Sequence, residues 1–240
     1  MKKTVRLLIS CEHASHSIPP RFQSLGVSPE ALISHSSWDP GAGDLAKEVA
    51  GAFGIFPFLG GYSRLLVDLN RSSDNPEVIP EISYGLAVPG NRALSVGDRL
   101  ERLRRYYTPY RSAVRKAAVE ATAAGDVCMH VAIHSFTPEY ASQVREGRLG
   151  VLFDAASELE AKVADEMLAS LRAESLDARP NYPYDGAEDS LTTTLRTELS
   201  AQGYVGVQVE LSQYDIDSAP GILRYSEPVE RAVRRAILAV

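Results

Sequence analysis

Short β-rich runs alternate with helical segments along this chain of 240 residues, and that alternation limits the folds it can adopt. Strands that alternate with helices usually form a largely parallel sheet covered by helices on both faces. We therefore predict a three-layer α/β/α sandwich with a mostly parallel, mixed sheet, in a single domain spanning residues 1–240. The predicted strands are 5–10, 55–58, 64–69, 127–133, 149–153 and 205–211.

Helix signals flank several of these runs. Asp39 is a candidate N-cap with Pro40 in the first turn, and an apolar stripe follows at helical spacing. A second helical region covers about 95–124, where Pro109 should kink or split it. Further helices are predicted from Ser157, which has a capping-box glutamate three residues later, and from about Ser226. The Pro-, Gly- and Asn-rich stretch 72–91 is predicted to be a long surface loop with a functional role.

Composition excludes several classes of protein. The chain has 25 basic and 31 acidic residues, so its formal charge is −6, and it has no basic run that would favour nucleic acid or an anionic membrane as partner. No apolar run reaches the roughly 18–20 residues needed to span a bilayer. The apolar stretch near the N-terminus is interrupted by Arg6 and reads as a strand rather than a signal peptide. Cys11 and Cys128 form no Cys-x-x-Cys pair, so we expect reduced thiols and a cytoplasmic location.

Polar side chains gather just past the predicted strands. In α/β sheets, ligands bind outside the carboxyl ends of the strands, so these positions are the first candidates for a site. The residues are Glu12, His13, His16, Asp68, Asn70, Arg71, His134 and Glu210.

These residue types suggest a metal site that binds an acidic substrate. Two histidines and a carboxylate form a common zinc set, and zinc lowers the pKa of water so that a nearby carboxylate can act as general base. An arginine beside an asparagine suits a substrate carboxylate, and strand alternation would place Arg64, Asp68 and Asn70 on one face. Glu210 lies in an apolar run and needs a partner or a function. His35 and His130 are more simply explained as ordinary surface or core residues.

Six segments, in order along most of the chain, resemble the N-formylglutamate amidohydrolase family. That family is distantly similar to zinc carboxypeptidases and succinylglutamate desuccinylases, which implies their α/β sandwich. The segments are Ser10-Cys11-Glu12-His13-Ala14-Ser15, Trp38-Asp39-Pro40-Gly41-Ala42, Tyr62-Ser63-Arg64 through Asp68-Leu69-Asn70-Arg71, His134-Ser135-Phe136-Thr137-Pro138, Asn181-Tyr182-Pro183-Tyr184 and Val209-Glu210-Leu211-Ser212-Gln213.

The resemblance implies a ligand set for one zinc ion per chain. His13 would be the first ligand and His134 the second. Carboxypeptidases have a glutamate three residues after the first histidine, but this chain has His16 at that position. Asp39 is therefore the preferred third ligand, with Glu12 and His16 as alternatives.

The resemblance also implies the remaining roles. Glu210 would be the general base, Arg64 would polarise the scissile carbonyl, and Asn70 with Arg71 would hold a substrate carboxylate. The expected function is zinc-dependent hydrolysis of a small N-acyl amino acid, foremost N-formyl-L-glutamate to formate and L-glutamate. Ser212 stands where the family often has arginine, which leaves the substrate open. The alternatives are a deacylase or small peptidase for another N-acyl amino acid, and a catalytically silent binding relative.

Overall fold

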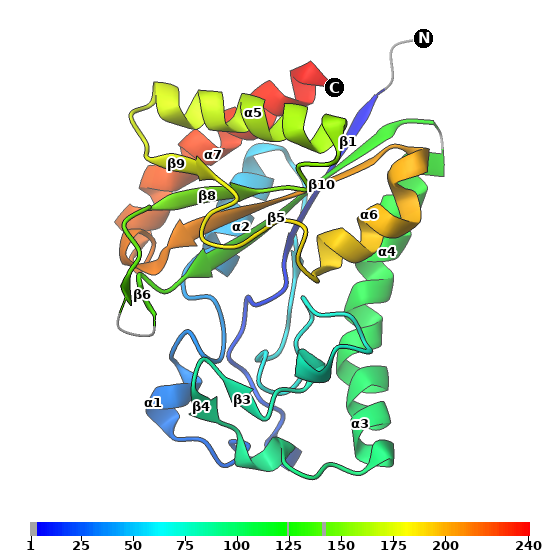
Figure 1. The fold of residues 1–240 in the computed structure, drawn as a ribbon, viewed down its shortest axis with the longest axis vertical. Coiled ribbons are helices and arrows are strands. Elements are labelled where there is room, and N and C mark those ends of the chain that lie inside the picture. Colours follow the sequence, from blue (N-terminus) through cyan, green and yellow to red (C-terminus); the bar gives the residue numbers. More distant parts are fainter. Residues whose placement is uncertain (1–3, 124, 141–142) are drawn as a thin grey trace.

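A six-stranded sheet forms the centre of the structure, a computed structural model that describes residues 4–123, 125–140 and 143–240 (Figure 1). The strand order is β2-β1-β5-β10-β8-β9, and every neighbouring pair is parallel except β10 and β8. This confirms the predicted mostly parallel, mixed sheet. The strands are β1 (Val5–Cys11), β2 (Phe58–Leu59), β5 (Val127–Phe136), β10 (Tyr204–Ser212), β8 (Leu149–Leu152) and β9 (Ala178–Pro180).

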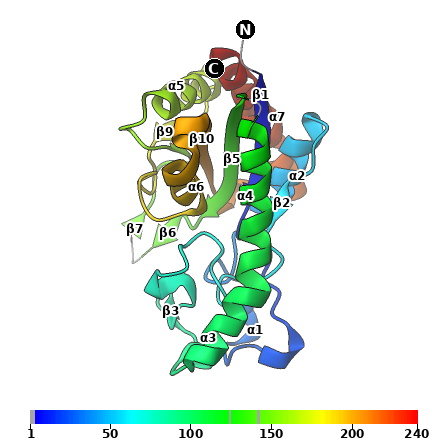
Figure 2. The same ribbon diagram turned by 90° about the vertical axis from the view of Figure 1, so that its right-hand side faces the viewer.

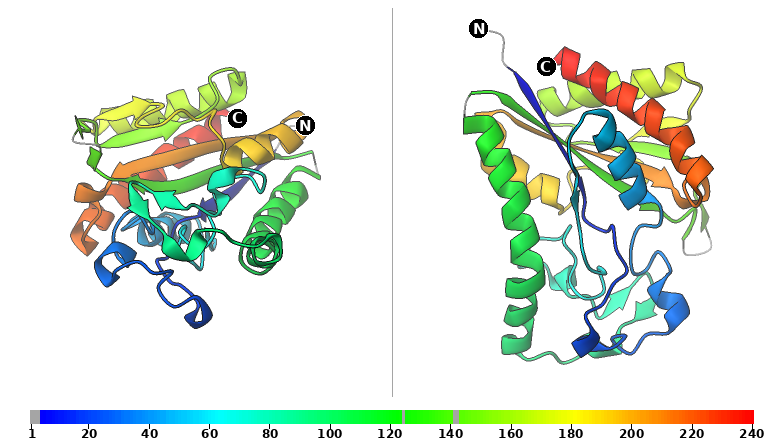
Figure 3. Two further views of the ribbon diagram at one scale, coloured as in Figure 1. Left: turned by 60° about the horizontal axis from the view of Figure 1, so that its bottom comes forward. Right: turned by 180° about the vertical axis from the view of Figure 1, so that it is seen from behind.

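Helices cover both faces of the sheet, as predicted (Figures 1 and 3). On one face, α2 (Ala42–Ala52), α5 (Glu158–Ala173) and α7 (Ala219–Ala239) share a large apolar core with the sheet. On the other, α4 (Thr108–Ala123) and α6 (Leu191–Leu199) enclose a smaller core. No helix among the described residues is both long enough and apolar enough to cross a bilayer.

The two central strands are buried along their whole length because helices or the site cover both of their faces. Odd-numbered residues such as Val131 and Val207 belong to the larger core. Even-numbered residues face the other way: Cys128 and Tyr204 lie in the smaller core, and later even positions include the polar residues His134 and Glu210. The period of two in a strand therefore sends these polar side chains to one face.

A second region packs against the carboxyl-terminal edge of the sheet and contains two further groups of buried apolar residues (Figure 1). It is connected to the sheet by a long helical rod in which α3 (Val96–Arg102) runs through a π-helical turn, Leu103–Tyr107, into α4 (Figure 2). Helical residues run without a break from Val96 to Ala123 through Pro109, so Pro109 does not split the predicted helix. The other short elements are α1 (Pro29–Leu32), β3 (Ile82–Ser83), β4 (Leu86–Ala87), α3 (Val96–Arg102), β6 (Glu139–Tyr140) and β7 (Gln143–Val144).

One predicted strand is wrong. Residues 64–69 form turns rather than a strand, although Leu65, Leu66 and Val67 are fully buried. Their apolar side chains pack in the second region instead of in the sheet, so burial here produced a strand-like pattern without a strand. Strand alternation therefore does not place Arg64, Asp68 and Asn70, although all three line one cavity.

Helix boundaries also differ from the predictions. The helix after Asp39 begins at Ala42, with Gly41 in the left-handed conformation before it, so Asp39 is not the N-cap. The last helix begins at Ala219, capped by Ser218, and Pro228 lies inside it. Helix α6 was not predicted. By contrast, Ser157 caps α5 as expected, and the stripe from Leu45 to Ala50 is buried.

The packing of β8 generates a test of the fold. A Cβ atom on Gly150 would overlap the carbonyl oxygen of Tyr182, whereas one on Gly51 in α2 would meet nothing within 4 Å. We expect Gly150→Ala to lower the free energy of unfolding in urea by about 2 kcal/mol or more. The control Gly51→Ala should raise it by about 0.5 kcal/mol. Equal effects of the two substitutions would contradict the close approach at β8.

Candidate metal centre and active site

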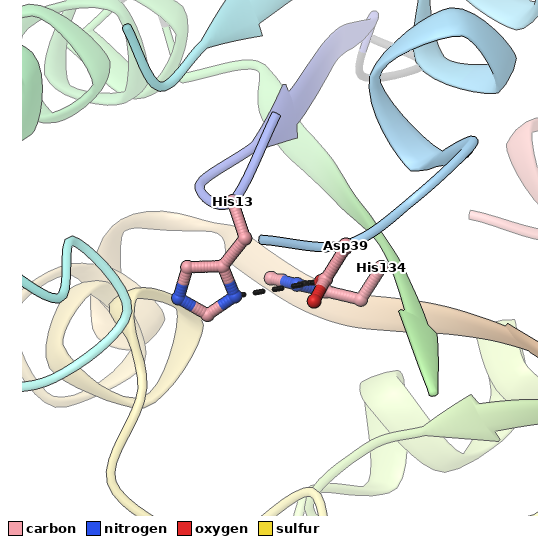
Figure 4. A group of neighbouring side chains, drawn as sticks. All are labelled: His13, Asp39 and His134. Carbon is pink, nitrogen blue, oxygen red and sulfur yellow. Dashed lines mark hydrogen bonds and ion pairs between the residues drawn. The ribbon is translucent and has the colours of Figure 1, made fainter. Parts of the chain in front are cut away.

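Two histidines and one aspartate meet at a buried point near the carboxyl ends of the strands (Figure 4). His13 lies in the turn after β1, Asp39 lies in the turn before α2, and His134 lies in β5. Nδ1 of His134 is 2.9 Å from Asp39 Oδ2, and Nδ1 of His13 is 3.4 Å from the same oxygen. One potential ligand atom from each residue lies within 4.8 Å of the others. The arrangement could hold a metal ion.

A second carboxylate stands behind each imidazole. Nε2 of His13 donates to Oδ1 of Asp68 at 2.7 Å, and Nε2 of His134 lies 2.9 Å from Oε2 of Glu12. A carboxylate on the outer nitrogen fixes the ring and leaves the other nitrogen directed at the metal position. Both Nδ1 atoms therefore point into the cluster, because a carboxylate stands at Nε2 on the other side of each ring.

Burial and these contacts together shift the pKa values of the two histidines in opposite directions. Burial, with the nearby charge of Arg64, lowers the pKa of His13 to about 4. Burial alone would raise the pKa of Glu12, but His134 holds it at about 2. Burial would likewise raise the pKa of Asp68, but His13 holds it below its usual range. The pKa of His134 is raised because Glu12 outweighs the effect of burial. The outer carboxylates are thus ionised at neutral pH.

Arg64 reaches the cluster from the buried turn at 64–69. Its Nη2 is paired with Oδ1 of Asp39, so one oxygen of Asp39 faces the arginine and the other faces the two histidines. Nη1 lies 3.5 Å from the hydroxyl of Tyr84. Nε of Arg64 is buried and has no hydrogen-bond partner among the described residues.

Glu210 is placed by strand register. It lies directly opposite His134 in the parallel pair of β5 and β10, so both side chains emerge on the same face at neighbouring positions. Its carboxylate is buried, and Oε2 has no hydrogen-bond partner within the described part of the chain. Burial raises the pKa of Glu210, although the charges of His134 and Arg64 oppose the shift.

Asn70 and Arg71 line the same cavity but are already engaged. Oδ1 of Asn70 accepts from the backbone N–H of Leu191 at the start of α6 (2.9 Å). Nη1 of Arg71 donates to the carbonyl oxygen of Asp189 at 2.6 Å, and its Nε is 3.9 Å from Glu77. The segment before α6 thus holds this pair of residues in place.

A comparison with known protein families matches residues 5–216 to the N-formylglutamate amidohydrolase family. The chain belongs to this family. It is a family of hydrolases, and the buried cluster just described lies within the matched residues. The resemblance found in the sequence is thereby confirmed.

Two solved structures are similar over nearly the whole chain. A gene product from Agrobacterium tumefaciens is 33% identical, with a TM-score of 0.88, over 97% of this chain and 90% of that one. An N-formylglutamate amidohydrolase from Ralstonia eutropha JMP134 is 18% identical, with a TM-score of 0.73, over 99% and 95% of the two chains. The second likeness supports the fold alone. No protein with a curated description matches the sequence significantly.

The site of this family member opens into a cavity of about 290 Å³. Sequence reasoning missed several of its wall residues, among them Tyr84, Arg145, Tyr184 and Asp189. Tyr84 belongs to the loop 72–91, for which a functional role was predicted, and Tyr184 lies in one of the segments that resemble the family. Arg145 carried no signal, because it follows a short hairpin far from any predicted strand end.

The other histidines and the alternative ligand Glu12 lie outside the His13–Asp39–His134 group. Glu12 contacts the far nitrogen of His134 and accepts from the Tyr110 hydroxyl at 2.8 Å. His16 is exposed and packs edge-on against Trp38, and His35 packs against Tyr84. His130 is fully buried in β5, as expected for a core residue.

His130 therefore generates a test of its own. Its two ring nitrogens are each 2.7 Å from a hydroxyl, that of Ser10 and that of Tyr204. His130→Leu should lower the free energy of unfolding by about 2 kcal/mol or more, because it leaves two buried hydroxyls without this partner. The control His16→Leu, on the surface, should change it by less than about 0.5 kcal/mol. Unchanged stability of the His130 variant in urea would refute a structural role for this ring.

Proposed function

We propose that this chain is a zinc-dependent amidohydrolase that converts N-formyl-L-glutamate to formate and L-glutamate. The observation that carries the proposal is the buried His13–Asp39–His134 cluster beside an unpartnered Glu210 carboxylate in a member of this family. The cavity over the cluster, about 290 Å³, suits a small N-acyl amino acid.

The donor set fits one zinc ion. Two imidazole nitrogens and one carboxylate are a usual three-ligand set for catalytic zinc, with a further position left open. Four buried carboxylates surround Arg64 and the two imidazoles, which favours an added cation; they belong to Glu12, Asp39, Asp68 and Glu210. When bound, zinc would supply a Lewis acid that polarises a carbonyl group and lowers the pKa of water.

Glu210 is the proposed general base. Its unpartnered Oε2 can accept a proton from the attacking water and donate it to the amide nitrogen that leaves. Burial raises the pKa of Glu210 toward the range in which a carboxylate can both take up and release a proton near neutral pH. Its position opposite His134 keeps that carboxylate beside the proposed metal position.

Arg64 is proposed to stabilise the charge that develops on the carbonyl oxygen. Its buried, unpartnered Nε–H is a donor that gains most when negative charge forms nearby. Its ion pair with Asp39 holds the guanidinium in place, so little reorganisation is needed.

Arg71 is proposed to bind a carboxylate of the substrate, with Asn70 beside it. The guanidinium lines the cavity, and its contact with the Asp189 carbonyl engages only one nitrogen. The remaining N–H groups can form the two-point contact that guanidinium makes with carboxylate.

We propose a cytoplasmic location, which the two free, buried cysteines support.

Two other readings remain as candidates. Another N-acyl amino acid, or a small peptide, could be the substrate of the same machinery. A binding protein without turnover is less well supported, because His13, His134 and Glu210 are all in place around one point. Release of the free amino acid, measured over a panel of N-formyl and other N-acyl amino acids and small peptides, distinguishes these readings.

The metal assignment predicts about one zinc per chain in protein purified without added metal. We expect the double variant His13→Ala/His134→Ala to lose this zinc, because two of its three ligands are gone, and to be less stable, because buried carboxylates lose their partners. Elemental analysis of both proteins provides the measurement. Stoichiometric zinc in the double variant would place the metal elsewhere.

Glu210→Gln should abolish most turnover without affecting folding or zinc content. The amide keeps the shape of the side chain but removes the base, so kcat should fall by roughly 10²–10⁴-fold with little change in KM. Melting temperature, zinc content and kcat should be measured on one preparation. A folded, zinc-loaded variant with normal kcat would exclude Glu210 as the base.

A further inference from the structure

Three arginines line the cavity, and they differ in what balances their charge. Arg64 is paired with Asp39, and Arg71 lies 3.9 Å from Glu77. Arg145 has no carboxylate within 4 Å among the described residues. The charge of Arg145 is therefore available to pair with an anionic group of a bound ligand.

Neutral groups hold the Arg145 side chain. Its Nη1 donates to the carbonyl oxygen of Thr137 and lies 3.2 Å from the hydroxyl of Tyr184. Its guanidinium carbon is 5.0 Å from the centre of the Tyr184 ring and 5.4 Å from that of Tyr140. These contacts fix the direction of the guanidinium and leave its charge uncompensated.

Arg145 and Arg71 reach the cavity from different parts of the fold. It follows the β6–β7 hairpin at the edge of the sheet that faces the second region (Figures 1 and 2). Arg71 is held instead by the segment before α6. The rings of Tyr84, Tyr140 and Tyr184 also gather here, with Tyr84 and Tyr140 centred 5.6 Å apart and the hydroxyls of Tyr84 and Tyr184 3.3 Å apart.

A surface of this kind matches a short acidic side chain. The aromatic faces can pack against methylene groups, and the guanidinium beyond them can bind a terminal carboxylate at two points. We propose that Arg145 binds the side-chain carboxylate of the substrate, and so selects dicarboxylic N-acyl amino acids over neutral ones. This inference rests on the proposed function and adds to it a residue that determines specificity.

The position of Arg145 in the cavity agrees with a role in substrate binding. Arg145 lines the same cavity as Glu210, the proposed base. A purely structural arginine, which only holds the hairpin against Tyr184, would affect all substrates equally. The distinction between substrates therefore decides between the two roles.

The test compares two substrates of nearly equal size, N-formyl-L-glutamate and N-formyl-L-glutamine. The protein should have a higher kcat/KM for the glutamate compound. Arg145→Gln should reduce that kcat/KM by about 10- to 100-fold, the usual loss for a charged hydrogen bond, and change that for the glutamine compound little. Arg145→Lys, which keeps the charge, should retain part of the preference.

Arg148→Gln is the matched control, because Arg148 lies three residues on, is half exposed and pairs with Asp215 outside the cavity. It should keep the full preference for glutamate. Loss of activity on both substrates in Arg145→Gln, or an unchanged preference in that variant, would overturn the inference. So would a protein without any preference between the two substrates.

Failure of the proposed function has a separate signature. If the protein hydrolyses neither compound, calorimetric titration with L-glutamate and L-glutamine still tests Arg145. Tighter binding of glutamate that disappears in Arg145→Gln supports the inference without the reaction. Equal binding of the two amino acids, or binding of neither, overturns it.

Discussion

The buried carboxylate of Asp39 constrains the geometry of the whole site. One of its oxygens pairs with Arg64, and the other faces His13 and His134. An unpaired carboxylate at this depth would cost several kcal/mol, so the elements that carry these residues must stay together. Those elements are the end of β1, the turn before α2, the turn at 64–69 and strand β5. Because further carboxylates stand behind the histidines, the cluster carries the excess of negative charge that suits a divalent cation.

The sheet places Glu210 beside this cluster. The parallel register of β5 and β10 sets His134 beside Glu210, and the period of two directs both toward the same face. The helical rod then holds the second region against that edge, where the Tyr107 hydroxyl donates to the carbonyl oxygen of Arg71 at 2.9 Å. A π-helical turn lies at this point of the rod, and such turns are frequent near functional sites.

Local patterns predicted the sheet and brought His13 and His134 together, whereas Asp39 was predicted as their partner only through the resemblance to the family. His134 and Glu210 interrupt apolar strands at positions of one parity, and His13 follows a strand end. The turn at 64–69 could not be recognised, because its apolar residues are buried by a second core formed over long sequence separations. Helix α6 places Leu191, Leu195 and Leu199 on one buried face, but sequence reasoning missed this short stripe among threonines, which are weak helix formers. Arg145 and Tyr184 meet only through tertiary contacts, so no spacing along the chain signals them.

The central claim is that His13, Asp39 and His134 together bind one zinc ion beside Glu210. An anomalous difference map, recorded from crystals of the protein at wavelengths on either side of the zinc absorption edge, tests this claim most directly. We predict a single strong peak between Nδ1 of His13, Nδ1 of His134 and the Asp39 carboxylate, with Nε2 of each ring still on its outer carboxylate. A peak at any other place, or coordination through either Nε2, would contradict the account.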